Sequence, residues 1–213
     1  MGYYFPEGSS QQFSQTFASA KTITAVTNAN PAVATSVAHG YATGDEILFT
    51  SGWEDATDTV WKITVLTADT FSISGLDASS TSFYPAGGGV GTAQKISGWT
   101  SIPQVLTINT SGGDARFTDV NPLAKRNGVK IPTGFNATAV TLTLAHDAAQ
   151  AAYITMQGIS RNLSKVAFKQ VISGGAVTYG YGYMSVSEMP KLNVNQVNTV
   201  DAAITVLGRS ISY

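Results

Sequence analysis

One histidine stands near two carboxylates, in a stretch with the residue types that acid–base catalysis needs. The segment SVAHGYATGDEILF, residues 36–49, contains His39, Asp45 and Glu46. An imidazole that titrates near neutral pH and lies beside a carboxylate can act as a general base. No nucleophile motif lies nearby, and Gly40 and Gly44 are typical of turns. We therefore interpret the stretch as two turns around a short strand, and we predict no catalytic site.

Two further motifs suggest ligand binding but lack essential parts. Glu54, Asp55 and Asp58 carry oxygens that suit calcium, yet they lack the spaced ligands of a calcium loop. The glycine-rich segment 87–91, GGGVG, lacks the lysine of a phosphate-binding loop, and no helix follows it. We predict a solvated acidic loop and a flexible glycine-rich exit, with no metal or cofactor site.

A row of tyrosines alternates with glycine at residues 179–183. Tyr179, Tyr181 and Tyr183 share one face of a predicted strand. An exposed row can stack against sugars, whereas a covered row packs a sheet or a subunit contact. We favour packing. Lys165 and Lys169 also share a strand face, and Val166 and Phe168 lie on the opposite face of the same predicted strand.

The composition favours a mainly β protein. The 213 residues are 43% hydrophobic but only 12% charged, with 21 glycines and a net charge of −1. A near-neutral chain is a poor candidate for gripping nucleic-acid phosphates. Because there is no cysteine, disulfide and thiolate chemistry are excluded. The first residues do not resemble a signal peptide, and no apolar run is long enough to span a membrane.

The charge distribution divides the chain. Residues 21–95 contain three lysines and seven acids, a net charge of −4, whereas the remainder has a net charge of +3. The acidic section is dense in strand and turn signals, including two strands around Ala68–Asp69. We predict one core domain, residues 1–20 and 96–213, with a small all-β domain inserted at 21–95.

The C-terminal part should combine one helix with long strands. In HDAAQAAYITMQGIS, Asp147 can cap a helix that ends at Gly158 and buries one face. Strands are predicted at 163–172 and 177–187, joined by a turn at 173–176, and at 192–207. In the last strand, residues 200, 202, 204 and 206 should face the core.

The final strand suggests an oligomer. From Leu192 to Tyr213 the chain has only two charges, Asp201 and Arg209. A long, nearly uncharged strand at a sheet edge would pair with other chains. We therefore expect this strand to find its missing neighbours in other copies of the protein.

This order of elements resembles a known family. Residues 146–213, HDAAQAAYITMQGIS to TVLGRS, resemble the core of a siphophage major tail tube protein of the lambda type. Residues 23–47, containing HGYATGDE, resemble a small β module of phage tail proteins. The resemblance implies a tail-tube β-sandwich or barrel core with one helix, plus the small inserted β domain on the outer surface.

The resemblance also implies a function and partners. Six copies would form a ring, and stacked rings would form a conduit for phage DNA in the virion tail, assembled in the bacterial cytoplasm. The implied partners are the protein itself, the tape-measure protein, and the tail terminator and tip proteins, with DNA passing unbound and no membrane. The alternative is a β-sandwich tail protein that binds carbohydrate or a receptor.

Two sets of residues follow from this hypothesis. Lys165 and Lys169 either line the bore or pair with acids such as Asp201 or Glu188 on neighbouring strands, and both interpretations stay open. Loops at residues 1–12 and 109–136 are predicted to join stacked rings. The basic residues of the second loop are Arg116, Lys125, Arg126 and Lys130.

Overall fold

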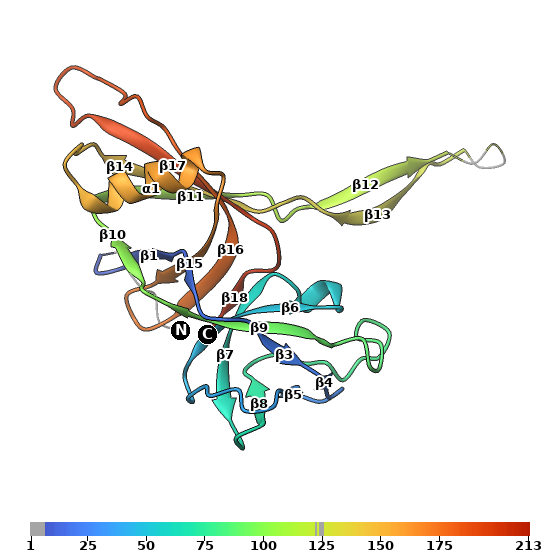
Figure 1. Cartoon of the computed structure of the whole chain (residues 1–213). Helices are drawn as coiled ribbons and strands as arrows, with labels where there is room; N and C mark the ends of the chain where they lie inside the picture. The colour runs from blue at the N-terminus through green and yellow to red at the C-terminus, as the bar shows by residue number, and fades with distance from the viewer. Residues whose placement is uncertain (1–6, 122, 124–125) are drawn as a thin grey trace.

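The computed structural model describes residues 7–121, 123 and 126–213 and contains two large antiparallel sheets and a projecting hairpin (Figure 1). The first sheet has the order β10-β1-β15-β16-β17-β14-β11, with β18 also paired to β16. Its strands are β1 (Ser10–Ser14), β10 (Thr100–Ile102), β11 (Val105–Ser111), β14 (Ala139–Ala145), β15 (Lys165–Val171), β16 (Val177–Val186), β17 (Thr199–Val206) and β18 (Ile211–Ser212). The fold is mainly β with one α-helix among the described residues, as predicted.

The first sheet folds back on itself. Its two end strands, β10 and β11, are consecutive in the chain and separated only by Pro103 and Gln104. Strand β16 joins the two halves, because residues 177–183 pair with β15 and residues 182–186 pair with β17. Between the halves lies one hydrophobic cluster, which includes Phe13, Phe168, Leu142 and Ile204. The core region is thus a sandwich made from a single bent sheet.

Helix α1 (Ala151–Arg161) covers this cluster with Tyr153, Met156 and Ile159, as the helical spacing predicted. The predicted bounds were wrong at both ends. Asp147 instead accepts a hydrogen bond from the backbone of Ala149 in a turn before the helix. Gly158 lies inside the helix, which continues to Arg161.

The expectation of an unpaired terminal strand was also wrong. Strand β17 is only eight residues long, because residues 193–198 form a turn rather than continuing the strand. It pairs with β14 along one edge and with β16 along the other. Residues 200, 202, 204 and 206 face the core, as predicted. The open edges of the described sheet are its two end strands, β10 and β11, instead.

The second sheet is built almost entirely from residues 21–95, which we call the insert. Its strands are β2 (Thr16–Phe17), β3 (Lys21–Ile23), β4 (Ala25–Val26), β5 (Val33–Thr35), β6 (Glu46–Ser51), β7 (Thr59–Val65), β8 (Thr70–Ile73) and β9 (Gly91–Ser97), with a short 3₁₀ helix η1 (Glu54–Ala56). The entry and exit strands are neighbours, since Thr16 pairs with Ser97. A hydrophobic core of its own includes Trp53, Phe49 and Phe71.

The glycine-rich exit of the insert is packed, which corrects the expectation of a flexible segment. The Trp53 indole donates a hydrogen bond to the backbone oxygen of Pro85 at 2.8 Å. A Cβ on Gly89 would lie 2.8 Å from the Trp53 ring. The glycines therefore allow the chain to pass close to a buried tryptophan.

Residues 109–136, predicted as a loop, form the end of β11 and a hairpin that we call the arm. Its strands are β12 (Ala115–Val120) and β13 (Val129–Phe135). Figure 1 shows the arm projecting away from both sheets. The arm continues the β11–β14 ribbon through a bend at Gly112 and Gly113, both of which have positive φ. A Cβ on Gly112 would lie 2.0 Å from the Ala137 carbonyl oxygen, so this bend requires glycine.

Candidate assembly surfaces

His39 and the residues that follow it form a packed turn. His39 is 3% exposed and stacks against Tyr41, with a ring centroid separation of 5.2 Å. Its Nδ1 accepts the backbone N–H of Tyr41 at 2.9 Å, and its Nε2 lies 3.1 Å from the Thr67 carbonyl oxygen. These bonds place the ring proton on Nε2. Both nitrogens are used by the backbone, so His39 shapes the turn.

The two carboxylates that lie near His39 in the sequence have other partners in the structure. Asp45 is paired with Lys95 at 2.7 Å, while Glu46 points to the core region. Within the described ranges, no three acidic or histidine side chains gather as a metal site would require. No helix among these residues combines the length and apolar character needed to cross a membrane.

A charged and aromatic junction joins the insert to the core region. Glu46 accepts a hydrogen bond from Lys169 at 2.7 Å and another from the Tyr179 hydroxyl at 2.5 Å. The Lys169 and Glu46 side chains are only 19% and 12% exposed. The Lys169 ammonium also lies 5.1 Å from the centre of the Trp99 ring. This cluster comes from β6, β15 and β16, so it ties the two sheets together.

Tyrosine side chains complete the junction. Tyr213 donates its hydroxyl proton to the Ser74 carbonyl and accepts the backbone N–H of Lys62 at 3.0 Å. Burial raises the pKa of Tyr213. Burial, and then the hydrogen bond to Glu46, raises the pKa of Tyr179 well above its usual value. The phenols therefore stay neutral and act as hydrogen-bond donors at physiological pH.

The tyrosine row is mostly covered by this junction. Tyr179 and Tyr181 are 1% and 8% exposed, and only Tyr183 reaches solvent, at 43%. Lys165 lies over the Tyr181 and Tyr183 rings, at 5.8 and 5.6 Å. A sugar-binding platform would need an exposed row, so the packing interpretation fits the structure better.

The other half of the sandwich has an outward face of small polar residues. On β14, Val140, Leu142 and Leu144 point into the core, so Thr141 and Thr143 point outward. We call this surface the threonine face. Its central residues are Asn109, Thr141, Thr143, Asp201, Ala203 and Thr205.

The threonine face is almost uncharged. Its one central charge, Asp201, is paired with Lys191 and accepts a hydrogen bond from Thr143 at 3.2 Å. Because the hydrophobic cluster separates the two halves, this face and the insert-covered tyrosine face point to opposite sides. Figure 1 accordingly shows the insert below the core region and β11, β14 and β17 above.

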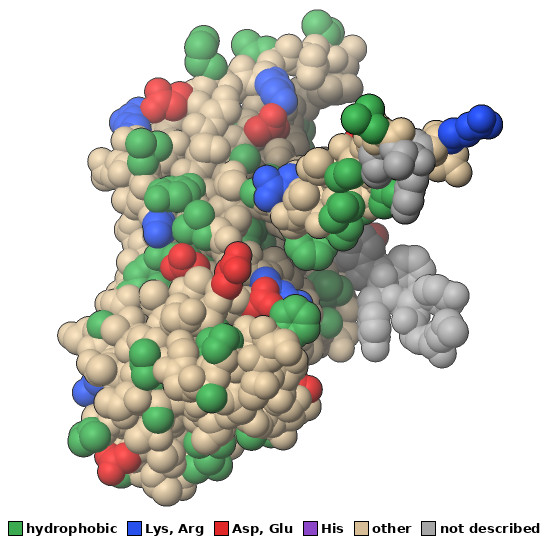
Figure 2. Space-filling model, turned by 90° about the vertical axis from the view of Figure 1, so that its right-hand side faces the viewer, with side chains coloured by type: hydrophobic (Ala, Val, Ile, Leu, Met, Phe, Trp, Pro, Cys, Tyr) green, Lys and Arg blue, Asp and Glu red, His purple; other side chains and the backbone are tan. Residues whose placement is uncertain are grey.

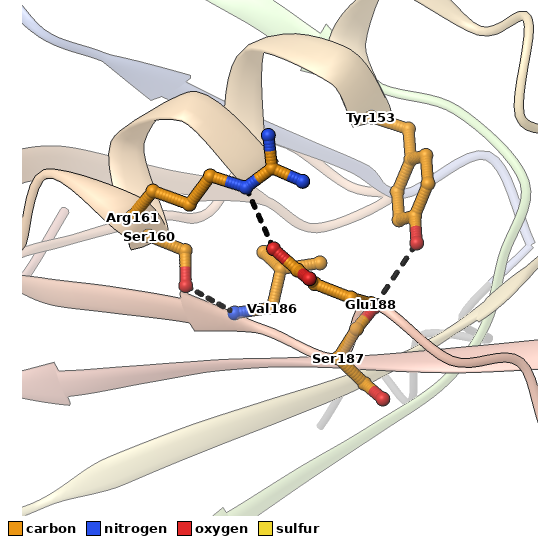
Figure 3. A network of polar contacts seen from close by, with 6 residues as sticks. All are labelled: Tyr153, Ser160, Arg161, Val186, Ser187 and Glu188. Atoms are coloured by element: carbon orange, nitrogen blue, oxygen red, sulfur yellow. Dashed lines mark hydrogen bonds and ion pairs between the residues drawn. The ribbon is translucent and has the colours of Figure 1, made fainter.

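Polar contacts at the edge of the sandwich hold helix α1 against the last residue of β16 and the two residues that follow it (Figure 3). Arg161 pairs with Glu188 at 2.7 Å, and Tyr153 donates to the Ser187 carbonyl at 3.0 Å. Ser160 accepts the backbone N–H of Val186 at 3.1 Å. Glu188 is thus engaged by the helix rather than by Lys165 or Lys169.

The basic residues singled out from the sequence lie on or near the arm. Arg116 and Lys130 belong to β12 and β13, Arg126 lies near the tip, and Lys125 lies outside the described residues. Figure 2 shows hydrophobic side chains along the arm and a basic side chain at its end. These hydrophobic residues, which sequence reasoning did not single out, are exposed: Phe117, Val120, Val129, Ile131 and Phe135. The alternation of apolar residues within 129–135 could have indicated them.

Comparison with protein-family models matches residues 51–213 to the phage tail tube protein family. The match covers the whole second half of the chain, including the arm, α1 and the final strands, and begins at the last residue of β6 in the insert. No curated protein matches the sequence at a significant level.

Proposed function

The chain belongs to the phage tail tube protein family, and from this premise we propose that six copies form a ring and that rings stack into the tube of a siphophage tail. Family membership makes the chain a structural virion protein that assembles with other tail proteins, and not an enzyme. The family match is the observation that carries the proposal. Assembly takes place in the bacterial cytoplasm, around the tape-measure protein and between the tail tip and terminator proteins.

The threonine face supports a conduit role. Duplex DNA carries one negative charge per about 1.7 Å of its length, so a lining that grips phosphates would retard it. A surface of threonine and alanine whose one central carboxylate is paired offers DNA little to bind. We assign this face to the bore, where it contacts DNA only in passing.

The insert belongs on the outside of the tube in this arrangement. It covers the face opposite the threonine face, where Lys169 is paired with Glu46. We therefore propose that residues 1–20 and 96–213 form the tube core and that residues 21–95 decorate its outer surface. In this arrangement Lys165 and Lys169 do not line the bore.

The arm is our candidate for contact between stacked rings. It projects from the ribbon β11–β14 and exposes apolar and basic side chains to solvent. A lone two-stranded hairpin is marginally stable in water, which favours a partner for it. The open edge of β11 supplies a second surface for pairing between copies.

Electron microscopy of the purified chain tests the proposal. We expect six-membered rings and tubes in negative stain. Excision of residues 115–135 is the matched variant, because Asp114 and Asn136 are hydrogen-bonded to each other and can be joined directly. The excised protein should remain folded and soluble but form no tubes. Discrete monomers from the intact chain, or normal tubes from the excised one, would contradict the assignment.

A further inference from the structure

A buried glutamine without a partner marks a second surface of interest. Gln11, on β1, is 2% exposed, and neither its Nε2 nor its Oε1 has a hydrogen-bond partner among the described residues. Burying an unsatisfied amide is costly, since water can no longer satisfy its donor and acceptor. An isolated subunit therefore carries a polar group suited to a partner that enters from outside.

Gln11 lines an open hollow in the sandwich. The hollow has a volume of about 1000 Å³ and lies between β1, the end of β15 and strand β11. Its walls mix apolar residues such as Ile102 and Ile108 with neutral polar ones such as Gln170 and Thr107. Glu7 is the one charged residue among those that line it.

Strand β11 borders the hollow with an unpaired edge. Among the described strands, it pairs with β14 on one side and with none on the other. Natural proteins block edge pairing with charged residues or proline on the edge strand. The sequence of β11, VLTINTS, contains neither. Such an edge is suited to accept another strand through backbone hydrogen bonds.

The arm has the complementary properties. The pairs Val120–Val129 and Thr118–Ile131 place three β-branched apolar side chains on one face of the hairpin. Val120, Val129 and Ile131 are 38%, 46% and 47% exposed. The arm points away from its own sandwich, so its chain does not cover this face (Figure 1).

We propose that the hollow receives the arm of a second copy of this chain. One arm strand pairs with the free edge of β11, the Val120–Val129–Ile131 face fills the hollow, and the arm backbone gives the Gln11 amide its missing hydrogen bonds. This inference rests on the proposed tube function and names the site at which one copy holds another.

The variant Gln11→Leu separates a role of the amide in binding the arm from a role in the stability of the subunit alone. Leucine keeps a similar volume and removes the unsatisfied amide, so the thermal stability of the unassembled subunit should stay the same or rise. Assembly should weaken, with the critical concentration for tube growth rising about tenfold. Gln12→Leu, on the opposite face of β1, is the control and should leave that concentration unchanged. An unchanged critical concentration for Gln11→Leu would overturn the role of the amide.

Photo-crosslinking locates the arm directly. Ile131→p-benzoylphenylalanine is incorporated in one copy and mixed with an isotope-labelled native copy before assembly. We expect crosslinks from the arm to residues 7–11 and 101–110 of the labelled copy, identified by mass spectrometry. Tubes whose crosslinks fall only elsewhere would overturn the docking site and leave the tube function standing. Failure of the native chain to form rings or tubes would instead refute the function itself.

Discussion

Removing the Lys169 ammonium should test how firmly the insert is attached to the core region. The variant Lys169→Met keeps most of the apolar stem but leaves the Glu46 carboxylate without its cation. Breaking a buried pair in this way typically costs 3–5 kcal/mol. The Tyr179 hydrogen bond and the 12% exposure of Glu46 partly compensate, so we expect a loss of about 3 kcal/mol.

The Arg161–Glu188 pair provides the control. It has the same 2.7 Å separation, but its side chains are 64% and 56% exposed. Arg161→Met should therefore cost less than about 1 kcal/mol. The double variant Lys169→Met with Glu46→Gln should recover most of the stability, because no uncompensated charge is left buried.

Urea unfolding followed by tryptophan fluorescence measures these differences, with Trp99 beside Lys169 as a local probe. Equal losses for Lys169→Met and Arg161→Met would refute the reasoning, because burial would then make no difference to the two pairs. A double variant as unstable as the single one would contradict the role of the unpaired carboxylate.

Three further outcomes are expected. Gly112→Ala should abolish tube growth, because the Cβ of the alanine would meet the Ala137 oxygen and redirect the arm. Electron microscopy checks this outcome. The control Gly158→Ala should form normal tubes, because there is open space around Gly158. Burial and the nearby Asp45 carboxylate raise the pKa of Tyr41 to about 12. As the pH rises above 10, the phenol ionises in the unfolded chain before it ionises in the folded one. The stability that the neutral phenol contributes below pH 10 should therefore decline between pH 10 and 12. Urea midpoints across this range should fall, and less steeply for Tyr41→Phe. Thr141→Lys should leave tubes intact but slow DNA ejection from virions at low salt, measured by dye release, whereas Thr81→Lys on the insert should not.

Local patterns predicted much of the core region. The alternation of Val166 and Phe168 with the lysines gave the correct inward face of β15. The glycine-containing turn at 173–176 correctly separated β15 from β16. These patterns can be found in the sequence because the spacing of apolar residues along a strand or helix shows which of its faces is buried.

The errors arose where nonlocal contacts decide the outcome. The unpaired strand edge was assigned to the C-terminal residues, but sequence cannot show that β14 and β16 flank β17. The glycines at 87–91 resembled a flexible exit because nothing in the sequence shows that Trp53 packs beside them.

The assembly surfaces were only partly predictable. The sequence showed that basic residues cluster within 109–136, but it did not predict the hairpin. The strands of the hairpin have no buried face in the subunit, so they lack the clear alternation of buried and exposed residues that identifies a strand. The Lys169–Glu46 pair joins residues 123 positions apart, and no spacing rule predicts such a contact. Gln11 is conspicuous only once its burial is known.

The side-by-side entry and exit of the insert also has a practical consequence. Because Thr16 and Ser97 are paired partners, the chain leaves and rejoins the core region within about one strand spacing, ~5 Å. A foreign domain whose own termini lie that close together can replace the native one at this position. Tubes built from such chimaeras would present the new domain as a regular array along a nanoscale filament, with its spacing dictated by the scaffold.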